Sequence, residues 1–262
     1  MYLINIELTN VCNLFCTYCA LTNGSRRKGI MDQKTFDRVL EVCEENRQFG
    51  LDLSHFGEPL LHPKVDGYVA QARKAGFFPG FCSNGLLLTA DRFKALIDVG
   101  LGWIAVTFHD AAKQTVSVKS RAKQQLIEAR ERCPELAKIA VDNRVALFFR
   151  QFADHEQIEN IDPRMAETIF KHDFAGLAAD RIAPQPFGGC IFLRLEHNVV
   201  FYDGKLGRCC YDERCRDEIG DIWSLPKKKT GRISICRNCS GIPEVHPIFG
   251  ARLEDLHRYL EV

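Results

Sequence analysis

Hydrophobic and polar positions recur along the first two thirds of the chain with two alternating periods. Short apolar runs rich in β-branched and aromatic residues predict strands, and segments with apolar residues three or four apart predict helices. The predicted strands are residues 3–8, 51–56, 77–82, 103–108 and 145–149, with a sixth near 180–183. The predicted helices are residues 32–47, which Asp32 caps, 64–74, which Gly76 ends, 91–99 and 119–132.

Strands and helices that alternate in this way predict a parallel sheet, because parallel neighbours need a crossover helix. We expect about six βα units curled into an open, partial (β/α)6 TIM-type barrel. In such barrels the reactive residues lie on loops after the carboxyl ends of the strands. The polar segments at these positions are Cys12–Cys19, Gly57-Glu58-Pro59, Ser83-Asn84-Gly85 and His109-Asp110.

The pattern changes after Pro184. Pro184-Gln185-Pro186 and Gly188-Gly189 indicate a boundary. Asp203-Gly204 predicts the turn of a hairpin between residues 192–202 and 205–210, and residues 251–260 predict a short amphipathic helix. The expected division is a barrel at 1–185, a cysteine-rich domain at 186–245 and a C-terminal helix at 246–262.

Composition narrows the class of protein. The 262 residues carry 35 Lys and Arg against 34 Asp and Glu, a net charge of +1, which does not favour a nucleic-acid partner. The first residues lack the pattern of a signal peptide, and no apolar run is long enough to span a membrane. The 12 cysteines of a protein expected in the cytoplasm then indicate metal or redox chemistry rather than disulfides.

Three cysteines follow the first predicted strand with the spacing C-x₃-C-x₂-C, namely Cys12, Cys16 and Cys19. Three thiolates can hold three irons of a [4Fe–4S] cube and leave the fourth iron open to a small molecule, whereas structural clusters usually take four cysteines. The alternatives are buried cysteines that only pack, and a zinc site, which would need a fourth Cys or His nearby.

With the aromatic Tyr18 before its third cysteine, this motif resembles the signature of radical S-adenosylmethionine (SAM) enzymes. Gly57-Glu58-Pro59 resembles the G-G-E-P motif of that family, with Phe56 in place of the first glycine. The resemblance implies that Cys12, Cys16 and Cys19 ligate the cluster and that SAM chelates the open iron. It also implies that Gly57, Glu58 and Pro59 receive the SAM amino group, and that Tyr18 lies against the adenine.

Further SAM and substrate contacts are implied at the other strand ends. Ser83 and Asn84, with Gly85, resemble the family's S/T-N-G segment, and an ordinary turn is the alternative. Thr107 and His109 end the fourth strand, where the family places polar contacts to SAM; a structural loop residue is the alternative for His109. Arg121 could pair with the SAM carboxylate, and Arg150 could hold a substrate anion or lie on the surface.

A second set of cysteines resembles the auxiliary-cluster region called SPASM or, in its shorter form, twitch. It comprises Cys190, Cys209, Cys236 and Cys239. The resemblance implies a second [4Fe–4S] cluster with four protein ligands, acting as electron conduit or substrate platform; a structural zinc ribbon is the alternative. Cys210 and Cys215 are left over and could donate a hydrogen atom to a substrate radical. Cys43, Cys82 and Cys133 are expected in the core.

The resemblance implies reductive cleavage of SAM to a 5′-deoxyadenosyl radical that abstracts a substrate hydrogen. We expect dehydrogenation or epimerisation of a small molecule such as an amino sugar or cyclitol, with flavodoxin or ferredoxin as electron donor. The first strand begins almost at Met1, which disfavours a leader-peptide-binding domain. The alternatives are epimerisation or crosslinking of a ribosomal peptide, a non-catalytic iron–sulfur or zinc protein, and a radical enzyme that modifies tRNA.

Overall fold

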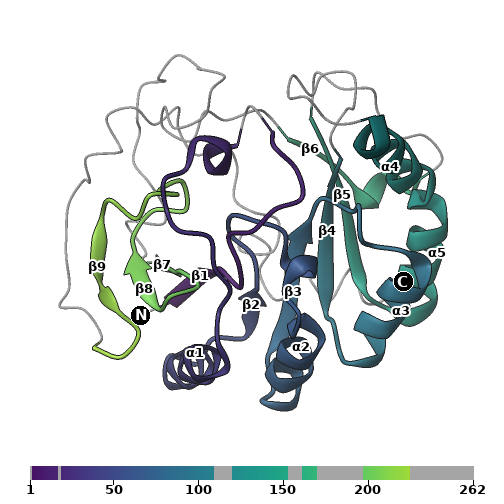
Figure 1. Cartoon of the computed structure of the whole chain (residues 1–262). Helices are drawn as coiled ribbons and strands as arrows, with labels where there is room; N and C mark the ends of the chain where they lie inside the picture. The colour runs from purple at the N-terminus through teal and green to yellow at the C-terminus, as the bar shows by residue number, and fades with distance from the viewer. Residues whose placement is uncertain (1, 17–18, 109–119, 153–160, 170–196, 225–262) are drawn as a thin grey trace.

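The structure is a computed structural model that describes residues 2–16, 19–108, 120–152, 161–169 and 197–224 (Figure 1). Its strands are β1 (Tyr2–Ile6), β2 (Gly50–Asp52), β3 (Phe78–Ser83), β4 (Trp103–Phe108), β5 (Ala146–Phe152), β6 (Ala166–Ile169), β7 (His197–Val200), β8 (Lys205–Gly207) and β9 (Glu218–Asp221). Its α-helices are α1 (Gln33–Glu45), α2 (Val65–Lys74), α3 (Ala90–Asp98), α4 (Ser120–Glu131) and α5 (Cys133–Asn143).

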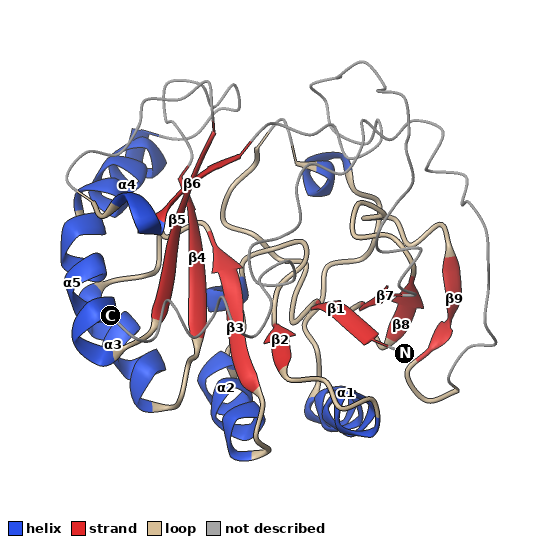
Figure 2. Cartoon of the chain, turned by 180° about the vertical axis from the view of Figure 1, so that it is seen from behind, coloured by secondary structure: helices blue, strands red, loops and turns tan. Residues whose placement is uncertain are grey.

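The strands form two sheets that lie side by side. The larger sheet is parallel, with the order β2-β3-β4-β5-β6. In the smaller sheet β7 pairs in parallel with β1, and β8 and β9 continue antiparallel from β7. The helices cover one face of this curved row of strands (Figures 1 and 2). The partial barrel predicted from the sequence is therefore confirmed.

Side chains join the two sheets where β1 and β2 meet. The Gln48 amide accepts from the backbone N–H of Leu3 at 3.0 Å and donates to its carbonyl at 2.8 Å. Near the other end of β1, Asn5 donates to an Asp52 carboxylate oxygen at 2.9 Å and to the Ser54 carbonyl at 3.1 Å. These bonds occupy backbone groups that would otherwise be left without partners.

The two faces of the larger sheet differ in what they contact. Phe81, Val106 and Phe149 belong to the main core beneath the helices. Alternate residues on the same strands, Trp103 and Phe148, form a second apolar layer on the concave face. This alternation decides which side chains can reach a ligand at the carboxyl ends of the strands.

Most predicted elements agree with the structure to within a few residues. Asp32 caps α1 by accepting the Thr35 N–H at 2.8 Å, as predicted. The strand predicted at 51–56 is shorter, because residues beyond Asp52 turn into the loop that carries Glu58. α5 was not predicted; it begins directly after α4, and its first turn accommodates a proline, which has no N–H to satisfy there.

The predictions for the later part of the chain agree with the structure only in part. The hairpin turn at Asp203-Gly204 is confirmed by β7 and β8, and Gly204 has φ +83°. β6 is the strand that extends the sheet beyond β5. The strand expected near 180–183 and the helix expected at 251–260 lie outside the described residues, and the predicted domain boundaries stay predictions. In the part of the chain that the structure describes, no helix is long and apolar enough to cross a membrane.

Candidate functional site

The loop that carries the three cysteines begins after β1 and is closed at its base by Asn10. The Asn10 side chain accepts from the Gly29 N–H at 2.8 Å and donates to the Arg27 carbonyl at 2.9 Å. Its backbone N–H donates to the Gly29 carbonyl at 3.3 Å. An amide side chain can donate and accept at once, so a single residue fixes both ends of the loop.

The three thiols lie together in this loop. Cys16 is buried and Cys12 and Cys19 are half-buried in an apolar cluster with Leu14 and Leu126. Burial raises the pKa of Cys12 to about 11 and that of Cys19 to about 12, and the neighbouring thiols add to both shifts. Such thiols resist ionisation unless a cation compensates them.

The donor set fits an iron–sulfur cluster. Within the described ranges, no three side chains of His, Cys, Asp or Glu converge as they would around a single metal ion. A [4Fe–4S] cube instead spreads its thiolates over separate irons. Three thiols in one partly exposed apolar cluster are compatible with that larger group.

Glu58 forms a buried hub beside the thiols. One carboxylate oxygen accepts from the Ser83 hydroxyl at 2.9 Å and the Leu60 N–H at 3.1 Å, and the other accepts from the Asn84 N–H at 2.8 Å. Burial raises the pKa of Glu58 to about 7, and the hydrogen bonds oppose that shift. The carboxylate therefore fixes the loops after β2 and β3 to each other.

Asn84 connects this hub to the cysteine loop. Its Nδ2 lies 3.9 Å from the Cys12 Sγ and donates to the Asn13 side chain at 2.7 Å. The backbone N–H of Glu58 donates to the Val11 carbonyl at 2.8 Å. The segments at Cys12, Glu58 and Asn84, far apart in sequence, thus form one connected site.

Gly57 makes this close approach feasible. Its φ is +92°, and a Cβ at this position would overlap the Thr9 carbonyl. Only glycine adopts such a conformation without strain. Phe56, where the family motif has its first glycine, is instead buried against Ala20 and Leu21.

The concave face of the sheet becomes polar towards the carboxyl ends of its strands. Arg150 lies beside Thr107 in the register of β4 and β5, and both are half-buried. Arg150 donates to the Cys82 Sγ at 3.0 Å. Cys82, expected in the core, is therefore a half-buried residue at the polar end of the concave face, whereas Cys43 and Cys133 are fully buried as predicted.

Asp52 was missed by sequence reasoning and belongs to this polar group. It accepts from Asn5 and from the backbone N–H and hydroxyl of Ser54. Burial raises its pKa to about 7, while the Ser54 hydroxyl and the charge of Arg150 oppose the shift. Asp52 lies between Leu51 and Leu53, which belong to the main core. Because successive strand residues point to opposite faces, this pattern was the sequence signal that Asp52 faces away from the main core.

The cysteine-rich segment approaches the three thiols from the smaller sheet. Cys209 and Tyr211 pack on the same small apolar cluster as Cys12 and Cys19, centred on Phe56. Cys210 and Cys215 instead pack against Ile4, Val199 and Phe201. Burial raises the pKa of Cys215 to about 12.

Several predicted site residues lie in parts of the chain that the structure does not describe. Tyr18, His109, Cys190, Cys236 and Cys239 are not among the described residues, and Arg121 belongs to α4 without a described side chain. Their predicted roles stay predictions.

Comparison with known proteins identifies the family. The model of the Radical SAM superfamily matches residues 6–150, which includes the three thiols, the Glu58 hub and Arg150. The chain belongs to the radical SAM superfamily. This confirms the family predicted from the cysteine spacing, and with it an enzyme whose cofactors are a [4Fe–4S] cluster and SAM.

Two curated relatives match part of the chain. A tungsten-containing aldehyde ferredoxin oxidoreductase cofactor-modifying protein of Pyrococcus furiosus is 33% identical over 104 residues, 38% of this chain and 29% of that protein. A PqqA peptide cyclase of Gluconobacter oxydans is 33% identical over 110 residues, 41% of this chain and 30% of that protein. The match thus spans less than a third of the length of either relative.

Solved structures share the fold over most of the chain. BtrN in complex with AdoMet and 2-DOIA superposes with a TM-score of 0.63 at 17% identity, over 86% of this chain and 80% of that one. Native anSMEcpe with bound AdoMet gives a TM-score of 0.63 at 12% identity, over 91% and 83% of the two chains. At these identities the likeness establishes the partial barrel alone.

Proposed function

We propose that this radical SAM enzyme abstracts a hydrogen atom from a small polar molecule, such as an amino sugar or cyclitol, and so dehydrogenates or epimerises it. Cys12, Cys16 and Cys19 hold the [4Fe–4S] cluster in this proposal, and the Gly57–Pro59 segment receives the SAM amino group. When bound, the reduced cluster and SAM supply the 5′-deoxyadenosyl radical. The protein orients SAM and substrate and limits the access of water.

The connected site of the three thiols, Asn84 and the Glu58 hub is the observation that carries the proposal. The Glu58 carboxylate bonds to Ser83, Leu60 and Asn84, so backbone groups of its segment are the better candidates for the SAM amino group. A buried carboxylate with three such bonds is a fixed support for a reactive loop.

The polar concave face supports a small, polar substrate. Arg150 offers a planar set of donors suited to hydroxyl or anionic oxygens, and the buried carboxylate of Asp52 lies nearby as an opposite charge. Thr107 and Cys82 complete the group, above the apolar layer of Trp103 and Phe148. Hydroxyl and amino groups on one ring would match donors and acceptors set so close together.

A ribosomal peptide is the second candidate substrate, favoured by the relatives. One curated relative is a PqqA peptide cyclase, and a further solved neighbour is SuiB of Streptococcus suis bound to its precursor peptide SuiA, with a TM-score of 0.54 at 11% identity. Both substrates share the proposed radical chemistry and differ in what the concave face must accommodate.

An auxiliary [4Fe–4S] cluster on Cys190, Cys209, Cys236 and Cys239 is part of the proposal. Cys209 supports it by lying half-buried beside the apolar cluster that also contacts Cys12 and Cys19. Cys210 and Cys215 remain candidate hydrogen donors for epimerisation, with flavodoxin or ferredoxin as the proposed reductant.

Anaerobic reconstitution of the full chain tests the proposal. We expect about eight irons per chain, two clusters of four, and cleavage of SAM to 5′-deoxyadenosine that depends on a strong reductant such as dithionite. Zinc in place of iron, or four irons without cleavage of SAM, would contradict it.

Replacement of Arg150 by methionine tests the substrate site. Hydrogen bonds to charged groups contribute about 1.5–3 kcal/mol, so the half-saturating concentration of a bound substrate should rise roughly 10–100-fold. The measurement is 5′-deoxyadenosine formation as a function of added 2-DOIA, with a short peptide in a parallel series. Basal SAM cleavage without substrate should stay within about twofold, and Arg92→Met, distant on α3, should behave as wild type.

If 2-DOIA has no effect and the peptide stimulates cleavage, the peptide alternative replaces the small molecule. Stimulation by 2-DOIA with the same half-saturating concentration in Arg150→Met and wild type would remove Arg150 from the substrate site.

A further inference from the structure

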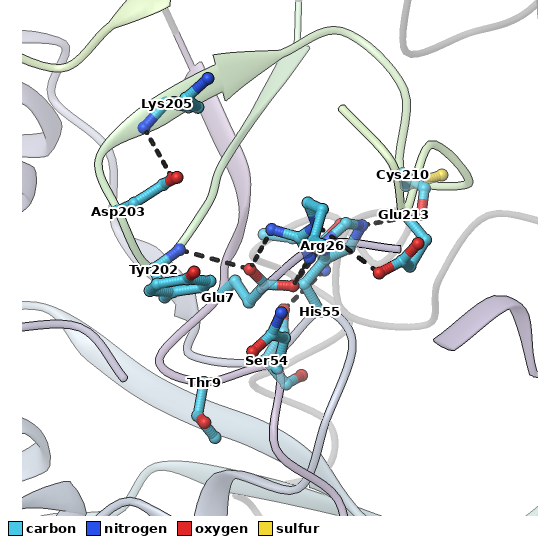
Figure 3. Close-up of polar contacts among 12 residues, drawn as sticks. Glu7, Thr9, Arg26, Ser54, His55, Tyr202, Asp203, Lys205, Cys210 and Glu213 are labelled. Carbon is cyan, nitrogen blue, oxygen red and sulfur yellow. Dashed lines mark hydrogen bonds and ion pairs between the residues drawn. The ribbon is translucent and has the colours of Figure 1, made fainter. Parts of the chain in front are cut away.

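A buried group of four ionisable side chains lies between the cysteine loop and the cysteine-rich segment (Figure 3). Glu7 follows β1, Arg26 lies on the return of the cysteine loop, His55 follows β2, and Glu213 lies between Cys209 and Cys215. The two glutamate side chains are 0% and 1% exposed, and that of Arg26 is 12% exposed. Burial of this many charges is costly unless they compensate one another.

Arg26 binds Glu7 with both terminal nitrogens. Nη1 donates to one carboxylate oxygen at 2.9 Å and Nη2 to the other at 2.6 Å. The guanidinium also lies over the ring of Phe201, 4.5 Å from its centroid. Burial would raise the pKa of Glu7, but the imidazole of His55 and the guanidinium of Arg26 lower it. Glu7 and Arg26 therefore form a fixed, charged pair at the end of β1.

Glu213 is held differently. Its carboxylate oxygens are buried without a hydrogen bond from any of the described residues, and its ion pair with Arg26 is long, 3.6 Å from Nε to Oε1. Burial raises the pKa of Glu213, and Arg26 opposes that shift. One guanidinium thus faces two carboxylates, of which Glu7 takes the hydrogen bonds (Figure 3).

Glu213 also lies against the cysteine loop. A Cβ on Gly24 would stand 2.5 Å from its Oε1, so the loop approaches the carboxylate at a residue without a side chain. Gly24 is joined to Cys19 by a single turn of 3₁₀ helix, Ala20–Asn23. Cys209, four residues before Glu213, packs on the same small apolar cluster as Cys19. The carboxylate therefore lies against the short segment that carries Cys19.

We infer that Glu213 and Arg26 are a pair of positioning residues that set the reduction potential of the cluster on Cys12, Cys16 and Cys19. The inference rests on the proposed function, because it takes these three thiols as the cluster ligands. A negative charge close to a cluster disfavours the addition of an electron, and a positive charge favours it. In the apolar surroundings of Cys19, Glu213 would keep the potential low, and Arg26 would limit that effect.

A low potential matters for the proposed reaction because the cluster must reduce a sulfonium. The segment that carries Glu213 also carries Cys209, Cys210 and Cys215, and the Cys210 carbonyl accepts from His55 Nε2 at 2.8 Å. The position of the cysteine-rich segment would therefore influence the radical-forming cluster through Glu213.

A redox titration of the reconstituted full chain, followed by electron paramagnetic resonance, tests the inference. The cluster with the open iron is recognised as the one whose signal changes when SAM is added. Glu213→Gln should shift its midpoint potential to more positive values, and Glu213→Asp, which keeps the charge, should shift it less. Gly24→Ala displaces the carboxylate without changing its charge and should shift the potential in the same direction as Glu213→Gln. Glu218→Gln, an exposed carboxylate paired with Lys205 on the same hairpin, is the matched control and should leave the potential unchanged.

Equal midpoint potentials in wild type, Glu213→Gln and Gly24→Ala would overturn the inference while the SAM-responsive signal remained. Failure of the wild-type chain to form a SAM-responsive cluster would instead count against the proposed function. Iron content, measured for each variant, separates a change in potential from a loss of the cluster.

Discussion

Replacement of Cys16 by alanine is expected to abolish the cleavage of SAM. Cys16 has the lowest exposed fraction of the three cysteines and packs in one apolar cluster with Cys12 and Cys19. Changes in the surroundings of a metal site already cost about 10–100-fold in affinity or activity, so loss of a ligand should cost at least about a hundredfold. Iron content and 5′-deoxyadenosine formation measure the effect on reconstituted protein.

The matched controls are Cys43→Ala and Cys133→Ala. Both cysteines are fully buried in the main core, away from the three thiols, and their replacement removes only one buried sulfur atom. We expect a loss of roughly 1 kcal/mol in the free energy of unfolding and unchanged iron content. Full SAM cleavage by Cys16→Ala would show that the triad does not hold the cluster.

Of the variants proposed for this protein, Arg26→Met is expected to lower the free energy of unfolding the most. Arg26 is the cation that binds Glu7, whose carboxylate is 0% exposed, and it also faces Glu213. Removal of one partner from a buried ion pair costs roughly 3–5 kcal/mol, because the other charge is left uncompensated. Total stabilities of about 5–15 kcal/mol make this a large fraction. Urea denaturation of the purified apo-protein measures the loss, with Arg92→Met as control.

The control and the pH dependence make the test specific. Arg92 pairs with Asp66 at 2.6 Å in a partly exposed position, and such pairs contribute about 0–1 kcal/mol. In wild type, His55 and Arg26 lower the pKa of Glu7, so the stabilisation from the ion pair is present above the ordinary glutamate pKa and is lost as pH falls through the lowered value. The difference between wild type and Arg26→Met should therefore be largest near neutral pH and narrow in acid. A difference under about 1 kcal/mol at neutral pH would contradict the role given to Arg26.

The sequence predicted local features well, because they depend on neighbours along the chain. The cap of α1 follows from Asp32 itself, and the strand at Trp103–Phe108 follows from a run rich in β-branched and aromatic residues. α5 was missed although Cys133, Leu136 and Ile139 have helical spacing, because it starts without a break after α4. The strand at residues 51–56 was predicted too long because the loop after Asp52 also holds buried apolar residues, and an apolar run does not by itself distinguish a strand from a buried loop.

The candidate site could be predicted from the sequence where the spacing of residues by itself indicates the chemistry. Three thiols within eight residues indicate a metal group whatever the fold, and Gly57-Glu58-Pro59 marks a strand end. The partners of Glu58 were suggested as separate SAM contacts, and the structure joins Ser83 and Asn84 to its carboxylate. Asp52 and Cys82 could not be assigned from the sequence, because the function of an alternating strand residue depends on which face meets the ligand.

The sequence by itself determined the family and the kind of cofactor, because the spacing of Cys12, Cys16 and Cys19 and the residue types of the loops are properties of the chain alone. Only the tertiary structure decided that Glu7, Arg26, His55 and Glu213 share one buried volume. These residues are up to 206 positions apart, and each is an ordinary charged residue in its own segment. Their interaction depends on the parallel pairing of β1 with β7, which brings the cysteine-rich segment against the cysteine loop. Burial turns four common side chains into a coupled group, and burial is decided by the whole fold.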